Sequence, residues 1–199
     1  MDINELKLDE DIYSYRVEVL KKIKEFNELL LQISVFTKPI VNNKIREFLE
    51  QFSSYFKTHN FTIESPQARV RIAENDLHTI NLTLTNSDDS GASFRFDIPT
   101  KSKYQTVEIR LSKESAPLLV WKNNLNDFDV QRILNSGYTH YVNSLFSVEE
   151  LEKLIKGLDE NIEWYKSTVI DLYKLEYTYG IYDSDEEFKD FREFFEDYV

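Results

Sequence analysis

The chain of 199 residues contains no cysteine at all. This absence excludes disulfide bridges, cysteine-ligated zinc or iron, thiol redox chemistry and cysteine nucleophiles. Because disulfides are common in oxidising compartments, the lack of cysteine favours a cytoplasmic location. The opening residues Met1–Glu5 are acidic and no apolar run follows them, so we expect no secretory signal.

Glycine and long apolar runs are also scarce. The four glycines, Gly91, Gly137, Gly157 and Gly180, are isolated from one another, whereas phosphate-binding loops and dinucleotide-binding turns need several close together. The most apolar stretch, residues 29–35, is far shorter than a membrane-spanning helix. Nucleotide binding of these types is therefore excluded, and no contact with a membrane is expected.

Positively charged residues are scarce in one part of the chain. The whole sequence has 36 Asp and Glu against 24 Lys and Arg, a net charge of -12, and residues 126–199 hold 18 of these acids against 7 basic residues. So one-sided a charge attracts a basic protein or a divalent cation and repels nucleic acid and anionic membranes. We expect a basic protein partner and no direct binding to nucleic acid.

Helical periodicity dominates residues 1–60. Apolar residues recur at intervals of three and four from Asp11 to Phe36, and again from Val41 to about Lys57, with Thr37 as a plausible cap and Pro39 in a first turn between them. The sequence therefore predicts an antiparallel hairpin of two helices.

Residues 61–114 change to a period of two, which is typical of β-strands. Four strands are expected around Val70–Ile72, Ile80–Leu84, Phe94–Ile98 and Val107–Leu111, and Phe61 with Ile63 suggests a fifth. Turn-forming residues separate them, so the pattern predicts an antiparallel meander.

The remaining sequence is predicted to be helical. Residues 115–146 are assigned to short helices and loops, and residues 147–199 to an acidic helical segment. Ser147 and Glu150 form a capping box before a 4-3 apolar repeat that reaches Tyr179, typical of a coiled coil, and the first helix is its expected antiparallel mate. A second box at Ser184–Glu187 predicts a final helix. The fold class is therefore α+β, as a single domain with a four- to five-stranded antiparallel sheet.

The predicted final helix separates acidic from aromatic residues. At 100° per residue, its aromatic side chains fall on one face and its carboxylates on the other. We expect the aromatic face, Phe188, Phe191, Phe195 and Tyr198, to dock on the body of the protein. The acidic face would then bind the partner, with help from the preceding long helix, through Asp185, Glu186, Asp190, Glu193, Asp197, Asp159 and Glu163. An ordinary solvated helix face is the alternative interpretation.

A second set of charged residues lies in the predicted sheet. Asp97, Glu108 and Arg110 are polar residues of two adjacent strands, expected within several Å of one another on one face. An Asp followed eleven residues later by Glu-x-Arg resembles the metal-binding core of the PD-(D/E)xK nucleases. That resemblance implies a Mg²⁺ ion held by Asp97 and Glu108, with Arg110 at the position of the family's lysine and Phe96 at that of its proline. Ion pairs across a wet sheet face are the alternative.

Four arginines, Arg69, Arg71, Arg95 and Arg110, are expected on that same face, either as an anion site or paired with carboxylates. The three histidines, His59, His78 and His140, show no metal-binding spacing. Apart from Asp97, Glu108 and Arg110, no motif indicates a cofactor, a metal or a catalytic group.

Three hypotheses follow from these patterns. The first is a non-enzymatic protein that inhibits or regulates a partner by occupying its basic, nucleic-acid-binding surface, as an anti-defence protein of a phage or mobile element would. The second is the Mg²⁺-dependent nuclease built on Asp97 and Glu108. The third is a structural module whose long helices form a homodimer, with the acidity serving solubility.

Overall fold

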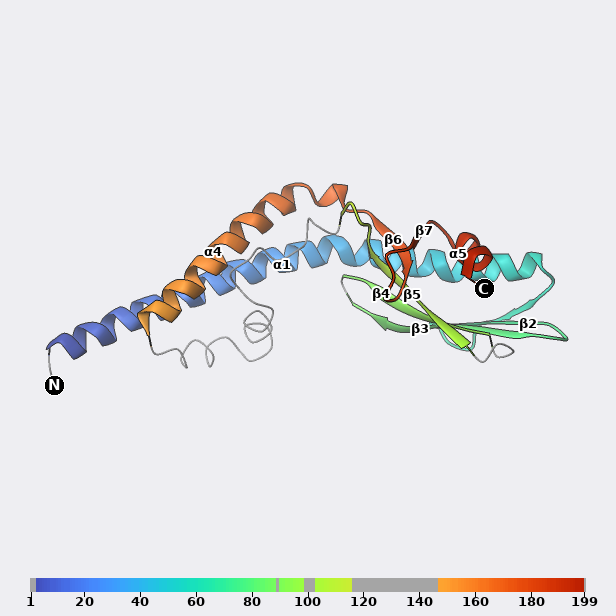
Figure 1. The fold of residues 1–199 in the computed structure, drawn as a ribbon, viewed down its shortest axis with the longest axis horizontal. Coiled ribbons are helices and arrows are strands. Elements are labelled where there is room, and N and C mark those ends of the chain that lie inside the picture. The colour runs from blue at the N-terminus through green and yellow to red at the C-terminus, as the bar shows by residue number, and fades with distance from the viewer. Residues whose placement is uncertain (1–2, 89, 99–102, 116–146, 199) are drawn as a thin grey trace. The chain divides into compact units, whose positions relative to one another are not determined.

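The computed structural model describes residues 3–88, 90–98, 103–115 and 147–198. The fold is α+β, with a long N-terminal helix and an antiparallel sheet (Figure 1). Its internal contacts define two compact units. Unit 1 comprises Met1–Ile33 and Leu118–Tyr173, and unit 2 comprises Ser34–Pro117 and Lys174–Val199. Short helices were expected in residues 115–146. Of this range, only Ser115 is among the described residues.

A single helix, α1 (Ile3–Thr58), replaces the predicted helical hairpin. The prediction of a break near Pro39 is wrong. A proline inside a helix removes one hydrogen bond and costs about 3 kcal/mol, but Ile33 and Val41 on either side of it are both buried, and burying apolar side chains offsets that cost. The helix ends where Asn60 adopts a left-handed φ of 64° and the Phe61 amide donates to the Phe56 carbonyl at 3.0 Å.

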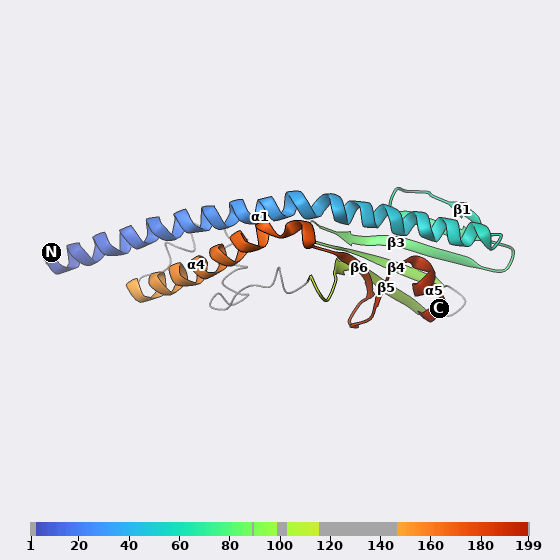
Figure 2. The same cartoon turned by 90° about the horizontal axis from the view of Figure 1, so that it is seen from above.

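Unit 1 pairs the first part of α1 with α4 (Val148–Ile170), and the two helices run in the same direction (Figure 2). Tyr15 donates to Glu152 at 2.8 Å, and Glu25 forms an ion pair with Lys166 at 3.0 Å, so residue numbers increase together along both helices. The antiparallel prediction is therefore wrong. Apolar side chains fill the seam, namely Val19, Ile23, Phe26, Leu151, Leu158, Ile162 and Tyr165.

The capping box at Ser147 is confirmed, because its hydroxyl accepts from the Glu150 amide and the Glu150 carboxylate accepts from the Ser147 amide. The predicted length of the helix is wrong. It ends at Ile170 and is followed by a 3-10 turn, η3 (Leu172–Lys174). Gly157, which the repeat placed outside the seam, is buried in α4.

The sheet of unit 2 has seven antiparallel strands in sequential order. The predicted meander and its fifth strand are confirmed, and two further strands come from the segment predicted to be helical. The strands are β1 (Thr62–Glu64), β2 (Val70–Glu74), β3 (Thr79–Ser87), β4 (Ala92–Ile98), β5 (Lys103–Leu111), β6 (Tyr177–Ile181) and β7 (Glu187–Phe188).

The core of unit 2 lies between one face of the sheet and two helices, the second part of α1 and the short α5 (Phe191–Tyr198). Aromatic rings dominate it. Phe48 of α1 lies 5.0 Å from Phe94 of β4, and Phe52 lies 5.3 Å from Phe191 of α5, measured between ring centroids. Such pairs add about 0.5–1.5 kcal/mol each to the burial of their surface. This core fixes β6, β7 and α5, where the candidate site lies.

Candidate functional site

An exposed acidic feature of unit 2 is the turn between β6 and β7, residues 182–186, which we call the hairpin tip. Tyr182 keeps 64% of its surface exposed, and the neighbouring Asp183, Asp185 and Glu186 are exposed as well. Asp183 adopts a left-handed φ of 59°, a conformation that Asp and Asn tolerate better than most residues. The tip therefore presents one aromatic ring beside three carboxylates.

Arg110 of β5 holds the hairpin tip in place. Its guanidinium donates to the backbone carbonyls of Ser184 at 2.7 Å and Glu186 at 3.1 Å. It reaches them by crossing Gly180 of β6, where a Cβ atom would lie 2.7 Å from the guanidinium carbon. Gly180 is thus required for this close approach, and the charged donor strengthens both hydrogen bonds.

Hydrogen bonds at both ends of the turn complete its support. The Tyr182 amide donates to the Thr106 carbonyl at 2.9 Å, and the Glu186 amide donates to the Ser184 hydroxyl at 3.1 Å. The turn is consequently bonded to β5 and to itself, while its carboxylates face outward. Pre-ordered side chains lose less conformational entropy when they bind a partner.

The predicted stripe of carboxylates along one helix is wrong. Asp185 and Glu186 belong to the hairpin tip, and α5 begins only at Phe191. Asp190 and Glu193 support the start of that helix, since Asp190 accepts from the Glu193 amide at 3.0 Å and Glu193 accepts from the Lys189 amide at 2.8 Å. The helix therefore starts at a cap six residues after the one predicted at Ser184. Asp197 lies in α5, and its side chain is outside the described part of the structure.

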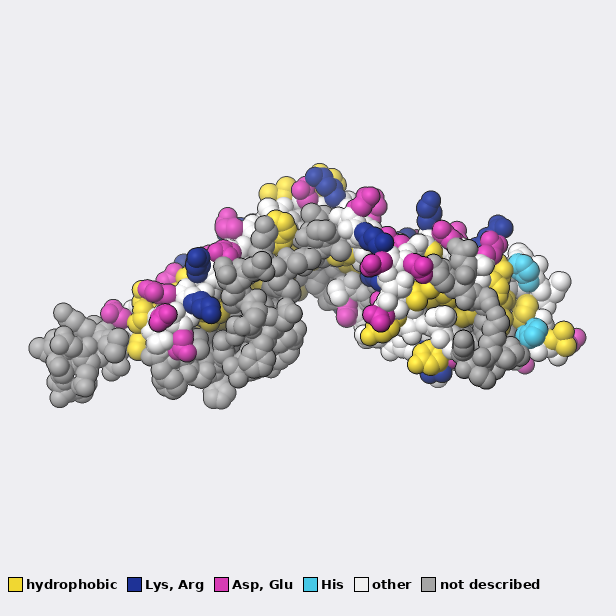
Figure 3. All heavy atoms as spheres, viewed as in Figure 1, with side chains coloured by type: hydrophobic (Ala, Val, Ile, Leu, Met, Phe, Trp, Pro, Cys, Tyr) yellow, Lys and Arg dark blue, Asp and Glu magenta, His cyan; other side chains and the backbone are white. Residues whose placement is uncertain are grey.

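The two predicted site residues of the long helix lie in the other compact unit. Asp159 pairs with Lys22 of α1, and Glu163 pairs with Lys166 at 3.0 Å. Figure 3 shows basic and acidic side chains interspersed along α4. These carboxylates are thus matched locally by lysines, in contrast to those of the hairpin tip.

Three of the four aromatic residues expected to dock do so, and the side chain of the fourth, Tyr198, lies outside the described part of the structure. Phe188 and Phe191 are buried, and Phe195 packs against the same core. Phe194 is fully buried too, although the predicted helix did not place it on this face. Docking of these rings orients the polar residues of β7 and α5 outward.

Asp97 and Glu108 share a face of the sheet but are not adjacent. Asp97 pairs with Tyr104 and Glu108 with Ser93, so four residues of β4, about 13 Å, separate the two positions. The predicted closeness is wrong, because the register places Glu108 opposite Ser93 and not near Asp97. No group of three His, Asp or Glu side chains able to hold a metal ion occurs in the described ranges.

The predicted cluster of four arginines is also wrong. Arg71 pairs with Leu82, a residue of the buried face, whereas Arg95 pairs with Thr83 on the other face. The alternative, pairing with carboxylates, is observed: Arg95 contacts Asp97 at 2.8 Å, and Arg110 lies 4.0 Å from Glu108. The bond to Asp97 is the main cause that raises the pKa of Arg95.

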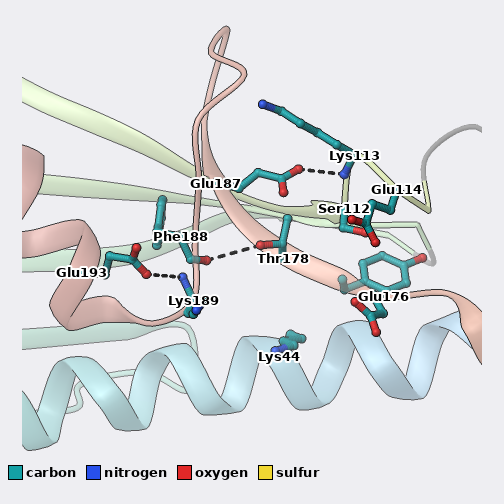
Figure 4. A pocket seen from close by; sticks show the side chains of 11 residues that line it. Lys44, Ser112, Lys113, Glu114, Glu176, Thr178, Glu187, Phe188, Lys189 and Glu193 are labelled. Carbon is teal, nitrogen blue, oxygen red and sulfur yellow. Dashed lines mark hydrogen bonds between the residues drawn. The ribbon is translucent and has the colours of Figure 1, made fainter.

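A groove of about 550 Å³ lies at the opposite end of β6 from the hairpin tip (Figure 4). It is bordered by α1, by the residues that follow β5, by the start of β6, and by β7 with the first turn of α5. Its charged lining residues are Lys44, Lys113, Glu114, Glu176, Glu187, Lys189 and Glu193.

Comparison with protein-family models, with curated proteins and with solved structures gave no match to this chain. Within the described residues, no helix is both long enough and apolar enough to cross a bilayer.

Sequence reasoning missed Tyr182, Asp183 and the supporting role of Arg110. The alternation of Tyr177, Tyr179 and Ile181 before a turn-forming Asp-Ser-Asp was a signal for a strand and hairpin. The helical repeat that continued through the same residues concealed it.

Proposed function

We propose that this chain is a non-enzymatic interaction protein that binds a basic surface of another protein through the hairpin tip. One observation carries the proposal: exposed Tyr182 stands beside three exposed carboxylates that form no ion pair within the described residues. Arg110 fixes the turn that bears them. Exposed carboxylates attract a cationic partner from a distance, and an aromatic side chain supplies contact area once the surfaces meet.

The surface best suited to this tip is one that ordinarily binds nucleic acid. Such surfaces gather Lys and Arg to contact phosphates, and the same groups would receive Asp183, Asp185 and Glu186. Occupying them would exclude the nucleic acid, so the protein would act as an inhibitor or regulator. A phage or mobile-element protein directed against a host defence is one setting for such an activity. A cytoplasmic location, and the homodimer of the alternative structural hypothesis, remain predictions from sequence.

The proposal is tested by exchanging the three tip carboxylates for amides, Asp183→Asn, Asp185→Asn and Glu186→Gln. The immobilised wild-type chain should retain a basic protein from a cell extract at low salt and release it at high salt, and the identified protein should lose its nucleic acid when the chain binds. The triple variant should bind that protein about ten-fold or more weakly, since three attractive charges are lost.

A matched control removes the same charge elsewhere on unit 2. Glu64→Gln, Glu74→Gln and Asp76→Asn neutralise three exposed carboxylates near the β1 edge, the far end of the sheet order from β7. This variant should bind like the wild type. Equal weakening in both triple variants would mean that only net charge matters, and an unchanged affinity in the tip variant would refute the tip as the binding site.

A further inference from the structure

A line of exposed apolar side chains runs along α1 on the side away from the buried seam. Tyr13, Val17, Leu31 and Val35, which we call the outer stripe, keep between 49% and 69% of their surface exposed. All four belong to one continuous helix (Figure 2), and at 100° per residue they lie within about 20° of one line along it. Phe26, which is buried in the seam, lies nearly opposite. Exposed apolar side chains aligned in this way mark a contact with another molecule.

The spacing of the outer stripe is the same when it is read in either direction. With the three residues between its two apolar pairs, the line consists of Tyr13, Val17, Leu20, Lys24, Glu28, Leu31 and Val35, at intervals of four, three, four, four, three and four residues. Intervals of three and four form the contact line of a coiled coil. A second copy that runs in the opposite direction therefore presents the same line, centred on residue 24, as a two-fold interface requires.

The charges beside the outer stripe also suit a second copy. They belong to Lys21, Lys24 and Glu28, whereas the whole chain has a net charge of -12. Two such chains repel each other over most of their surface, which favours contact where lysines outnumber carboxylates. Lys21 is exposed and forms no ion pair within the described ranges. In an opposed copy Glu28 would lie on the same flank, displaced from Lys21 by about 1.5 Å along the helix axis, so the two side chains attract each other across the interface.

Lys24 would meet its own copy at the centre of this pairing. Its side chain is 80% exposed, and its ammonium lies 4.0 Å from the carboxylate of Glu28 in the same chain. A lysine stem covers apolar surface while its ammonium stays in water. The two ammonium groups can therefore point apart, each beside a carboxylate, without separating the helices.

We infer that a second copy of this chain binds antiparallel to the outer stripe, with the two-fold axis at Lys24. Tyr13 then packs against Val35 of the second copy, and Val17 packs against Leu31, which removes these apolar side chains from water. A parallel dimer would instead place each residue beside its own copy, so Lys24 would face Lys24 and Glu28 would face Glu28. The inference is separate from the proposed function, because neither the hairpin tip nor a basic partner enters it.

Single cysteines test the pairing cleanly, because the full chain has none of its own. Under mild oxidation Lys24→Cys should form a disulfide-linked dimer about ten-fold or more faster than Leu77→Cys, an exposed position outside α1 that reports random collisions. Val17→Cys alone should not exceed that control, since its two copies would be about 21 Å apart along the axis. Mixing it with Leu31→Cys should give a mixed disulfide, detected by mass spectrometry.

Charged pairs test the orientation without cross-linking. Val17→Lys with Leu31→Glu should remain a dimer in sedimentation, because lysine meets glutamate, whereas Val17→Lys with Leu31→Lys should weaken the dimer about ten-fold or more. Both variants alter exposed residues, so circular dichroism should show that both stay folded. A wild-type chain that is monomeric at every concentration, equal masses for the two double variants, or Lys24→Cys that cross-links no faster than Leu77→Cys would overturn the inference. Rapid cross-linking of Val17→Cys alone would overturn the antiparallel orientation.

Discussion

A few side chains fix the position of the hairpin tip, and Arg110 is the most important of them. From the sequence it was a candidate for a nuclease centre or an arginine cluster, because Glu108 and Arg110 alternate along one strand. Alternation gives the face of a residue but not its partner across the sheet. The structure shows that Arg110 crosses Gly180 to two carbonyls of the turn, a contact 74 residues away in sequence that no local pattern could predict.

Replacing Gly180 by alanine should displace the Arg110 guanidinium from these carbonyls. A Cβ at Gly180 would lie 2.7 Å from the guanidinium, and a flexible side chain can move away, so the cost is mainly the loss of its hydrogen bonds, about 1–3 kcal/mol of unfolding free energy. Arg110→Ala should cost a similar amount, and the double variant should cost less than the sum. Chemical denaturation measures all three.

Gly91→Ala is a useful comparison, because its Cβ would meet the backbone carbonyl oxygen of Ile109 at 2.6 Å. A backbone atom cannot move aside without disturbing the β4–β5 pairing. Its cost should therefore come from the strand pairing and not from the guanidinium of Arg110, whereas additive costs for Gly180→Ala and Arg110→Ala would contradict the contact described here.

Tyr165 should make the stability of the protein depend on alkaline pH. Burial raises its pKa from 10.0 to about 12, so folding favours the neutral phenol. The stabilisation is complete below about pH 10, the unfolded value, and is lost as the pH rises toward 12. Denaturation measured between pH 8 and about 11.5 should show a smaller loss for Tyr165→Phe than for the wild type; identical slopes would show that the phenol is not buried.

At the scale of elements, periodicity predicted the helices and strands better than their ends. The capping box at Ser147 and the four central strands follow from local signals that the structure retains. The predictions of a break at Pro39 and of a helix that reaches Tyr179 were wrong, because tertiary burial outweighed local preference. Apolar residues continue across Pro39 in α1. Tyr177 and Tyr179 complete the aromatic core as parts of a strand.

The parallel arrangement of α1 and α4 in unit 1 predicts a specific coupling between Lys22 and Asp159. Their hydrogen bond is the largest cause that raises the pKa of Lys22. Reversing either charge, Lys22→Asp or Asp159→Lys, should lower the unfolding free energy by up to about 1 kcal/mol, and the combined swap should restore at least half of it. Thermal or chemical denaturation of the four chains gives the coupling energy.

Lys21 supplies the control for this cycle. It is an exposed neighbour of Lys22 on a different side of α1, so Lys21→Asp should show no coupling with Asp159→Lys. An antiparallel pairing of the two helices would place other residues opposite Lys22, and the swap of Lys22 with Asp159 would then fail to restore stability.

At the scale of the whole molecule, the carboxylates of the last third of the chain occur in two different environments. In α4, Asp159 and Glu163 are matched by Lys22 and Lys166. In the hairpin tip of unit 2, three carboxylates have no such match within the described residues, and Tyr182 is exposed beside them. Composition alone showed the excess of negative charge, but only the fold distinguishes neutralised carboxylates from those open to a partner.

Salt should affect binding more than it affects folding. Exposed charges are screened over about 8 Å at physiological ionic strength, and the carboxylates of the tip lie at the surface. Binding of the basic partner should therefore weaken steeply as salt is added, while the aromatic core of unit 2 keeps the protein folded.

The most direct test compares the affinity of the identified basic partner for the wild type and for the Asp183→Asn, Asp185→Asn, Glu186→Gln variant across a series of salt concentrations. The wild type should bind more tightly at low salt, with a steeper dependence of affinity on salt, and the two chains should converge at high salt as the charges are screened. Coincident curves at every salt concentration would contradict the claim that the hairpin tip carries the binding.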